Sequence, residues 1–90
     1  MAKLINIGYG NVVNSEKIVS VISPDSAPIR RLVQNSKDKG QAVDATQGRK
    51  TKSVIITDSS YVILSALMPD TIAGRFTSND SYGKDETNEE

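Results

Sequence analysis

Apolar residues along the first 76 positions fall into short clusters whose spacing predicts a series of strands. The run 18–22 is β-branched and apolar on both faces apart from Ser20, which is typical of a strand in the middle of a sheet. Two later runs flank Asp58-Ser59-Ser60, a spacing that predicts a tight hairpin. Strands are therefore expected at residues 3–7, 18–22, 41–45, 53–57 and 61–67.

Helical spacing appears once between these runs. Ile29, Leu32 and Val33 recur at i, i+3 and i+4, which predicts a helix with one buried stripe. Pro28 stands where the first helical residue is expected, Ser26 or Ala27 precedes it as the cap, and Gly40 ends the helix. The charged residues outside the stripe are interpreted as a solvated face, and no nucleic-acid contact is assigned to them; they are Arg30, Arg31 and Lys37.

A second, shorter helix is expected to begin at Pro69, with Ile72 and Phe76 one turn apart on its buried side. The fold class is thus a small α+β domain over residues 1–76. It has a mainly antiparallel sheet of about five strands, one central helix and a short C-terminal helix. Residues 77–90 are rich in Ser, Asn, Asp, Gly and Glu, and this acidic tail is expected to be disordered because it has almost nothing to bury.

Ninety residues make one domain with a core that is marginal alone. There is no cysteine and no histidine, which excludes disulfides, thiolate or imidazole metal sites and imidazole bases. The candidate carboxylates are isolated in the sequence, adjoin turns and match no catalytic motif; they are Asp25, Asp44 and Asp58. We therefore expect neither an enzyme nor a cofactor, and self-association as the route to stability. No apolar stretch fits a signal peptide or membrane span, so a cytoplasmic location is expected.

The zero net charge averages two unlike regions. Residues 1–76 contain ten Lys/Arg and six Asp/Glu, a net charge of +4, whereas residues 77–90 contain one lysine and five acidic residues, a net charge of −4. A basic domain with an acidic tail indicates contact with nucleic acid or another polyanion. An ordinary basic domain with a solubilising tail explains the same numbers.

The basic residues gather in one predicted loop between two strands. Gly48 allows a bend, and Arg49, Lys50 and Lys52 follow within four residues. Lys17, in another predicted turn, is a candidate neighbour. Cations held on a rigid frame can bind backbone phosphates, and copies of the loop in an oligomer would strengthen binding to double-stranded DNA. The alternative is a solvated turn.

Gly8-Tyr9-Gly10-Asn11 follows the first strand and offers a different function. A Gly-x-Gly after a strand can cradle a phosphate, but this one lacks the third glycine and the following helix. A structural turn is the preferred interpretation. A small-ligand or nucleotide-binding module using this turn remains an alternative, as does a purely structural assembly protein.

Four blocks of sequence resemble the RemA family, the bacterial extracellular matrix regulatory proteins A, over about residues 5–76. The resemblance implies a small α+β DNA-binding protein whose dimers form a closed ring, an octamer being one expected size. DNA is expected to wrap around the outside, and family members activate transcription of biofilm-matrix and osmoprotection genes. The blocks are residues 5–11, 22–29, 43–46 together with Gly48 and Arg49, and 54–59.

The same resemblance implies that DNA is contacted by Lys17, Arg49 and Lys50, with Lys52 nearby. The family usually has arginine where Lys17, Lys50 and Lys52 stand. Lysine keeps the charge but loses the bidentate fork, so phosphate binding is expected to persist while guanine-edge reading loses support. Gln47 stands where the family commonly has histidine.

Overall fold

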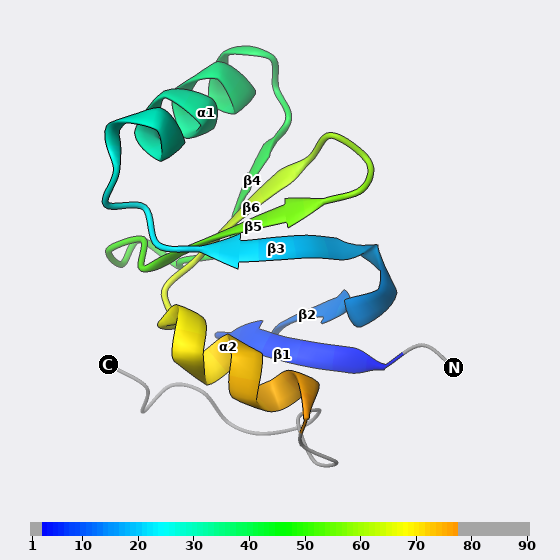
Figure 1. The fold of residues 1–90 in the computed structure, drawn as a ribbon. Helices are drawn as coiled ribbons and strands as arrows, with labels where there is room; N and C mark the ends of the chain where they lie inside the picture. Colours follow the sequence, from blue (N-terminus) through cyan, green and yellow to red (C-terminus); the bar gives the residue numbers. More distant parts are fainter. Residues whose placement is uncertain (1–2, 78–90) are drawn as a thin grey trace.

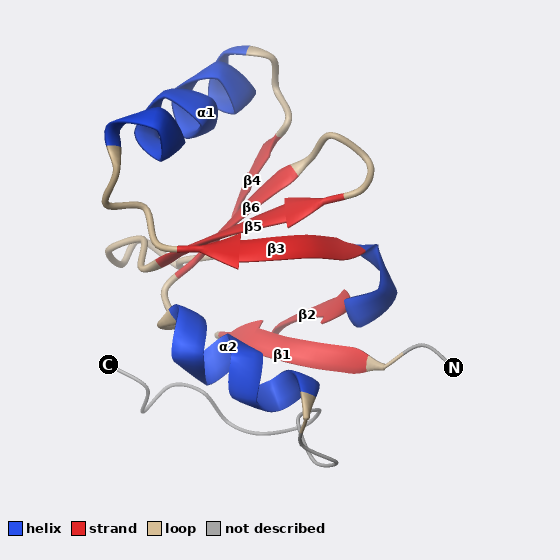
Figure 2. Ribbon diagram, in the orientation of Figure 1, coloured by secondary structure: helices blue, strands red, loops and turns tan. Residues whose placement is uncertain are grey.

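Six strands and two α-helices form the domain in the computed structural model, which describes residues 3–77 (Figures 1 and 2). The α+β class predicted from the sequence is confirmed. The expected disorder of the acidic tail concerns residues that, apart from Thr77, lie outside the described part. In chain order the elements are β1 Leu4–Gly8, β2 Asn11–Asn14, the 3₁₀ helix η1 Ser15–Lys17, β3 Ile18–Ile22, α1 Ala27–Asp38, β4 Ala42–Asp44, β5 Ser53–Thr57, β6 Val62–Ser65 and α2 Pro69–Phe76.

The strands form two sheets instead of one sheet of about five strands. β1 and β2 make an antiparallel pair, and the other four strands are ordered β3-β5-β6-β4. Neighbours in the larger sheet are antiparallel except β4 and β6, which run parallel. β2 was not expected as a strand, because turns on both sides reduce its apolar signal to Val12 and Val13.

The placement of β3 in the middle of a sheet was wrong. Among the described residues β3 pairs only with β5, so it is an edge strand, and Val19 at its bulge is 66% exposed. Ile18 and Val21 of β3 pack against the core that also contains Ile5 and Ile55, and no β3 residue is among those packed against the cluster under α1. A run of apolar residues along a strand thus carries no information on its hydrogen-bonded neighbours.

Helix α1 covers one face of the four-stranded sheet (Figure 1). Its predicted stripe of Ile29, Leu32 and Val33 packs against a cluster of Val54, Val62 and Leu64. The predicted caps are also confirmed. Ser26 accepts a hydrogen bond from the N–H of Ile29 (3.3 Å), and Gly40 lies beyond the C-terminus at φ +71°.

The opposite face packs on β1, β2 and α2, which lie below the sheet in Figure 1. Alternation along β5 and β6 divides their side chains between the two cores, so Ile55 enters the lower core while its neighbour Val54 faces α1. The lower core consists of Ile5, Ile7, Ala45, Ile55, Leu67 and Ile72.

Helix α2 begins at Pro69 as predicted, and Ile72 is fully buried. The expectation that Phe76 is buried was wrong, because its side chain is 37% exposed. The last turn of α2 lies beside the edge of β1, where Arg75 donates a hydrogen bond to the carbonyl oxygen of Asn6 (2.8 Å). A guanidinium group satisfies this carbonyl where an apolar ring could not.

Candidate nucleic-acid interface

The basic loop, residues 45–52, lies at the end of the four-stranded sheet where β3, β4 and β6 end and β5 begins. This end is on the left in Figure 1. Both ends of the loop are hydrogen-bonded to β6: the N–H of Ala45 donates to Leu64 (2.9 Å) and that of Lys52 donates to Ser65 (2.8 Å). The loop is therefore fixed to the sheet at its two ends.

Asp44 and Thr46 form the first turn of the basic loop. One carboxylate oxygen of Asp44 accepts hydrogen bonds from the backbone N–H (2.9 Å) and the hydroxyl (2.6 Å) of Thr46, which is itself buried. These bonds, the side-chain bond foremost, hold the pKa of Asp44 below its ordinary value, and the positive charge of Lys37 acts in the same direction. The carboxylate of Asp44 thus stays ionised and holds the loop in place.

The bend that exposes the cations follows immediately. Gln47 and Gly48 both have positive φ, +56° and +80°, and the N–H of Arg49 donates to the carbonyl oxygen of Thr46 (3.1 Å). The bend predicted at Gly48 is confirmed. The left-handed conformation of Gln47 was not expected, because a non-glycine residue seldom adopts it.

The turn between β1 and β2 supports the basic loop from below. The side-chain amide of Asn11 donates to the carbonyl oxygens of Gly8 (2.9 Å) and Ala45 (3.3 Å), and so joins the turn to the loop. The guanidinium of Arg49 lies over the Tyr9 ring, 5.0 Å from the centroid, a geometry that gives a cation–π attraction. Nothing in the sequence spacing of Tyr9 and Arg49 indicated this contact.

The same turn fits a phosphate cradle poorly. The N–H of Gly8 donates to the side-chain oxygen of Asn6 (2.7 Å), so it is already engaged. A side chain at position 8 would also lie 3.2 Å from Leu67, and φ there is +108°. Gly8 is thus required for close packing and backbone conformation, which favours the structural-turn interpretation.

The structure brings three of the four predicted site residues together. Arg49 and Lys50 are exposed and Lys52 is half-buried on the basic loop. Lys50 and Lys52 line a groove of about 420 Å³, the loop groove, whose other walls come from the segment after β3 and the start of α2. Two carboxylates, Asp25 and Asp70, also line this groove.

Lys17 lies elsewhere. It ends η1 at the start of β3, and its carbonyl oxygen accepts a hydrogen bond from the N–H of Asp58 in the β5–β6 hairpin (2.9 Å). The full length of β3, five residues or about 17 Å, separates it from the basic-loop end of the sheet. Within one copy of the chain, Lys17 is therefore not a neighbour of the other three cations.

Two further cations flank the basic loop. Arg30 and Lys37 line a second groove of about 300 Å³, the helix groove, together with Thr51. The two side chains are seven positions apart on α1, which is two helical turns on one face. That spacing was visible in the sequence, but the crossing of α1 over the sheet was needed to place this face beside the loop.

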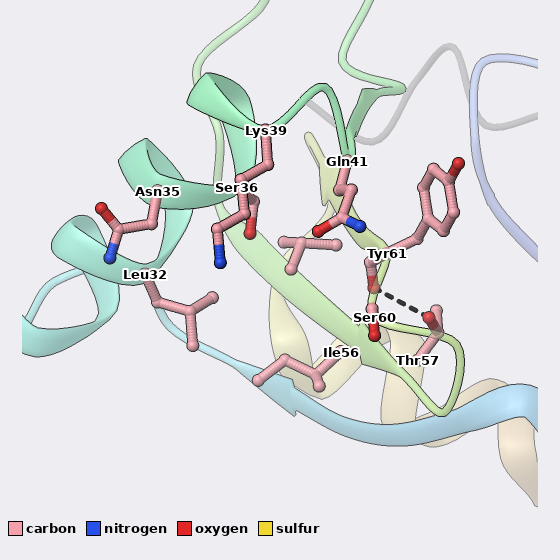
Figure 3. Close-up of a pocket in the computed structure, with 10 residues that line it drawn as sticks. Leu32, Asn35, Ser36, Lys39, Gln41, Ile56, Thr57, Ser60 and Tyr61 are labelled. Carbon is pink, nitrogen blue, oxygen red and sulfur yellow. Dashed lines mark hydrogen bonds between the residues drawn. The ribbon is translucent and has the colours of Figure 1, made fainter.

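A third pocket, of about 300 Å³, lies between α1 and the β5–β6 hairpin, at the other end of the sheet (Figure 3). Lys39 is the single cation on its lining, and the Thr57 hydroxyl donates to the backbone carbonyl of Tyr61 (2.8 Å) beside it. The lining contains no carboxylate to act with Lys39. Residues 3–77 contain no cluster of three or more His, Cys, Asp or Glu that could hold a metal. No helix within this range is long and apolar enough to cross a membrane.

Comparison with known proteins agrees with the resemblance seen in the sequence. The profile of the family described as RemA-like, extracellular matrix regulatory protein A-like, matches residues 4–76. Relatives named "Putative regulatory protein" occur in Clostridium novyi (strain NT), with 53% identity over 97% of both chains, and in Geobacillus thermodenitrificans (strain NG80-2), with 53% identity over 100% of this chain and 98% of the relative. A similarly named protein of Brevibacillus brevis is 58% identical over 87% of this chain and 91% of its own length.

Proposed function

This chain belongs to the RemA-like family, and from this premise we propose that it is a DNA-binding transcriptional regulator that assembles into a ring of dimers. The basic loop engages the phosphate backbone of double-stranded DNA. In this the protein resembles activators of biofilm-matrix and osmoprotection genes. The names of the relatives support a regulatory role. The proposal includes no enzymatic activity and no cofactor, and it places the protein in the cytoplasm.

The observation that supports DNA contact most directly is the fixed position of the basic loop. Its cations follow a turn anchored by Asp44, and both loop ends are bonded to β6. A loop held in one conformation loses little entropy when it meets a phosphate. Phosphate contacts position a protein on DNA without reading its sequence, which suits a loop with one arginine and two lysines.

Assembly is supported by the surface that one copy leaves exposed. Within residues 3–77, β3 and β4 are edge strands of the larger sheet, and unpaired edges are ready sites for pairing with another chain. Several large apolar side chains are also exposed, which indicates surfaces for association. They are Leu4, Val12, Val19, Val43, Tyr61, Met68 and Phe76. Assembly through such surfaces would repeat the basic loop along the DNA.

The test measures binding of a labelled DNA duplex at increasing salt, for the natural chain and for the Arg49→Ala/Lys50→Ala variant. We expect the logarithm of the association constant, log K, to fall linearly with the logarithm of the salt concentration. For the variant, the magnitude of this slope should be smaller by about 1.8 per bound copy, and the affinity should be lower by at least about tenfold. The Arg31→Ala/Lys39→Ala variant also removes two exposed charges and is the matched control. Light scattering of each variant checks that assembly is retained.

Two results would overturn the proposal. One is an Arg49→Ala/Lys50→Ala variant that binds as tightly as the natural chain with an unchanged salt slope. The other is a monomer at every concentration tested, because a single loop offers too few phosphate contacts for strong binding. A stable ring that binds no DNA at low salt would indicate the purely structural assembly protein instead.

A further inference from the structure

Helix α1 supplies the strongest unassigned feature of the surface, a pair of cations that continue the line of the basic loop. The loop groove and the helix groove share two lining residues, Pro24 and Thr51. The two depressions are therefore adjacent, and the pair is called the channel below. This channel runs from the start of α2, past Lys50 and Lys52, to the face of α1 that bears Arg30 and Lys37.

The charges along the channel are distributed unevenly. In the loop groove, Lys50 and Lys52 are accompanied by the carboxylates of Asp25 and Asp70. The lining of the helix groove includes Arg30 and Lys37 and no carboxylate. The excess positive charge of the channel is therefore greatest on the side of α1, where a polyanion would be attracted most strongly.

Two further carboxylates lie near α1 but are absent from the lining of the helix groove. Asp44 stays ionised and feels the positive charge of Lys37, while its oxygen accepts two hydrogen bonds from Thr46. Asp38, next to Lys37 in the sequence, accepts a hydrogen bond from the side-chain amide of Gln34 (3.1 Å). Both side chains of interest, Arg30 and Lys37, are exposed.

The spacing of the two cations also suits an extended ligand. Seven residues of α-helix rise about 10 Å, which is about three base-pair steps of duplex DNA at 3.4 Å each. Gln34 also lines the groove between them, although its side-chain amide already donates to Asp38. Two positive groups spaced in this way suit successive phosphates of a nucleic-acid strand better than one small anion.

We propose that the channel is a second phosphate-binding segment, in which Arg30 and Lys37 of α1 extend the DNA contact of the basic loop. The inference rests on the proposed function, because it assigns more residues to the same interface. It also revises the interpretation of the α1 charges as a solvated face. Arg31 and Lys39 lie outside both grooves, and the interpretation as a solvated face is kept for Arg31.

Two matched double substitutions test the proposal. Arg30→Gln/Lys37→Gln removes the channel cations, and Arg31→Gln/Lys39→Gln removes two positive charges from the same helix away from the channel. Glutamine favours helix and keeps most of the aliphatic stem, so both variants are expected to fold. We expect the channel variant to lose about 1.8 of its salt slope and several-fold in affinity for a mixed-sequence DNA duplex. The control variant should keep the salt slope and the affinity of the natural chain. The charge-preserving swap Arg30→Lys/Lys37→Arg should also have both.

The outcome can be separated from that of the proposed function. If the natural chain binds DNA and Arg49→Ala/Lys50→Ala abolishes binding, while the channel variant and its control behave alike, only the role of α1 is overturned. Equal losses in both α1 variants would also overturn it, because they would report net charge alone. If circular dichroism shows that the channel variant is unfolded, the single variants Arg30→Gln and Lys37→Gln decide: a loss of about 0.9 in salt slope for each folded variant supports the proposal, and an unchanged slope contradicts it.

Discussion

The two loops at opposite ends of the four-stranded sheet are held in place in different ways. The hairpin loop, Asp58-Ser59-Ser60, depends mainly on its immediate neighbours, with one distant bond from the N–H of Asp58 to the carbonyl oxygen of Lys17 (2.9 Å). The backbone N–H and the hydroxyl of Thr57 both donate to the carbonyl oxygen of Tyr61, four residues away (3.2 and 2.8 Å). The basic loop is bonded to β6 and to Asn11, which is 34 residues away from its partner Ala45.

This difference shows how a cluster of like charges can be held in one place. Three cations within four residues repel one another, and a loop stabilised only by its neighbours would spread them into solvent. Here the amide of Asn11 and the ring of Tyr9 hold the loop from a distant segment, while the carboxylate of Asp44 fixes its first turn locally. We therefore expect the basic loop to form after β1, β2 and β6 have assembled, and the hairpin to form earlier.

The largest effect on stability is expected at Ser65, which connects β1 to the end of the four-stranded sheet that carries the basic loop. Its buried hydroxyl donates to the carbonyl oxygen of Ile7 (2.9 Å) and accepts from the N–H of Leu67 (3.0 Å). Ser65→Ala leaves both groups buried without this partner, so we expect a loss of about 2–3 kcal/mol in the free energy of unfolding. Urea denaturation at fixed protein concentration measures it.

Thr57→Ala is the matched change at the hairpin end. The bonds that it removes, to Tyr61 and Ser59, are exposed, and the Thr57 N–H still donates to Tyr61, so we expect a loss of about 0.5 kcal/mol. Equal losses for the two alanine variants would contradict the contrast between the two loops.

An intermediate effect is expected from Asp44→Ala, about 1 kcal/mol at neutral pH because the side chain is exposed. The pKa of Asp44 is lowered below 3.8 in the folded chain. The carboxylate therefore stabilises the fold above its unfolded pKa, and this contribution is lost as the pH falls through the lower, folded value. We expect the stability difference between the natural chain and the variant to shrink on going from about pH 7 to about pH 3.

The Asp44 prediction is checked by denaturation curves at several pH values, with Asp44→Asn as the comparison. Asparagine keeps an acceptor for Thr46 but cannot titrate. A stability gap between the natural chain and Asp44→Ala that stays constant down to pH 3 would exclude the carboxylate as the anchor of the basic loop.

A smaller effect is expected when Lys17 and Lys50 are neutralised one at a time. If both meet phosphates in the assembly, Lys17→Gln and Lys50→Gln each lower the slope of log K against log salt by about 0.9. Their effects should add, because the length of β3 separates them. A Lys17→Gln variant that binds DNA as the natural chain does would confine the interface to one end of the sheet; Lys39→Gln is the control.

The smallest effects are expected at Tyr9, whose hydroxyl is buried and has no hydrogen-bond partner among residues 3–77. Tyr9→Phe keeps the ring under Arg49 and removes this hydroxyl, so we expect unchanged DNA binding and a stability gain of up to about 1 kcal/mol. Tyr9→Leu removes the cation–π contact and should weaken DNA binding by about two- to fivefold. Equal DNA affinity of the Phe and Leu variants would show that the ring does not position Arg49.

Local signals in the sequence predicted much of the fold. The cap at Ser26, the stop at Gly40 and the stripe on α1 were found because each depends on residues within about four positions of one another. The bend at Gly48 was found for the same reason. The edge position of β3 and the exposure of Phe76 were missed, since each depends on which layer or strand lies beside the residue, and a one-dimensional pattern does not encode that.

The candidate site divides in the same way. The sequence by itself determined that three cations follow one glycine between two strands, and that α1 has a charged face. Only the tertiary structure decided that Arg30 and Lys37 lie beside the basic loop while Lys17 lies a strand length away. The physical reason is that capping and periodicity act between near neighbours, whereas the order β3-β5-β6-β4 and the crossing of α1 follow from burying both faces of one sheet.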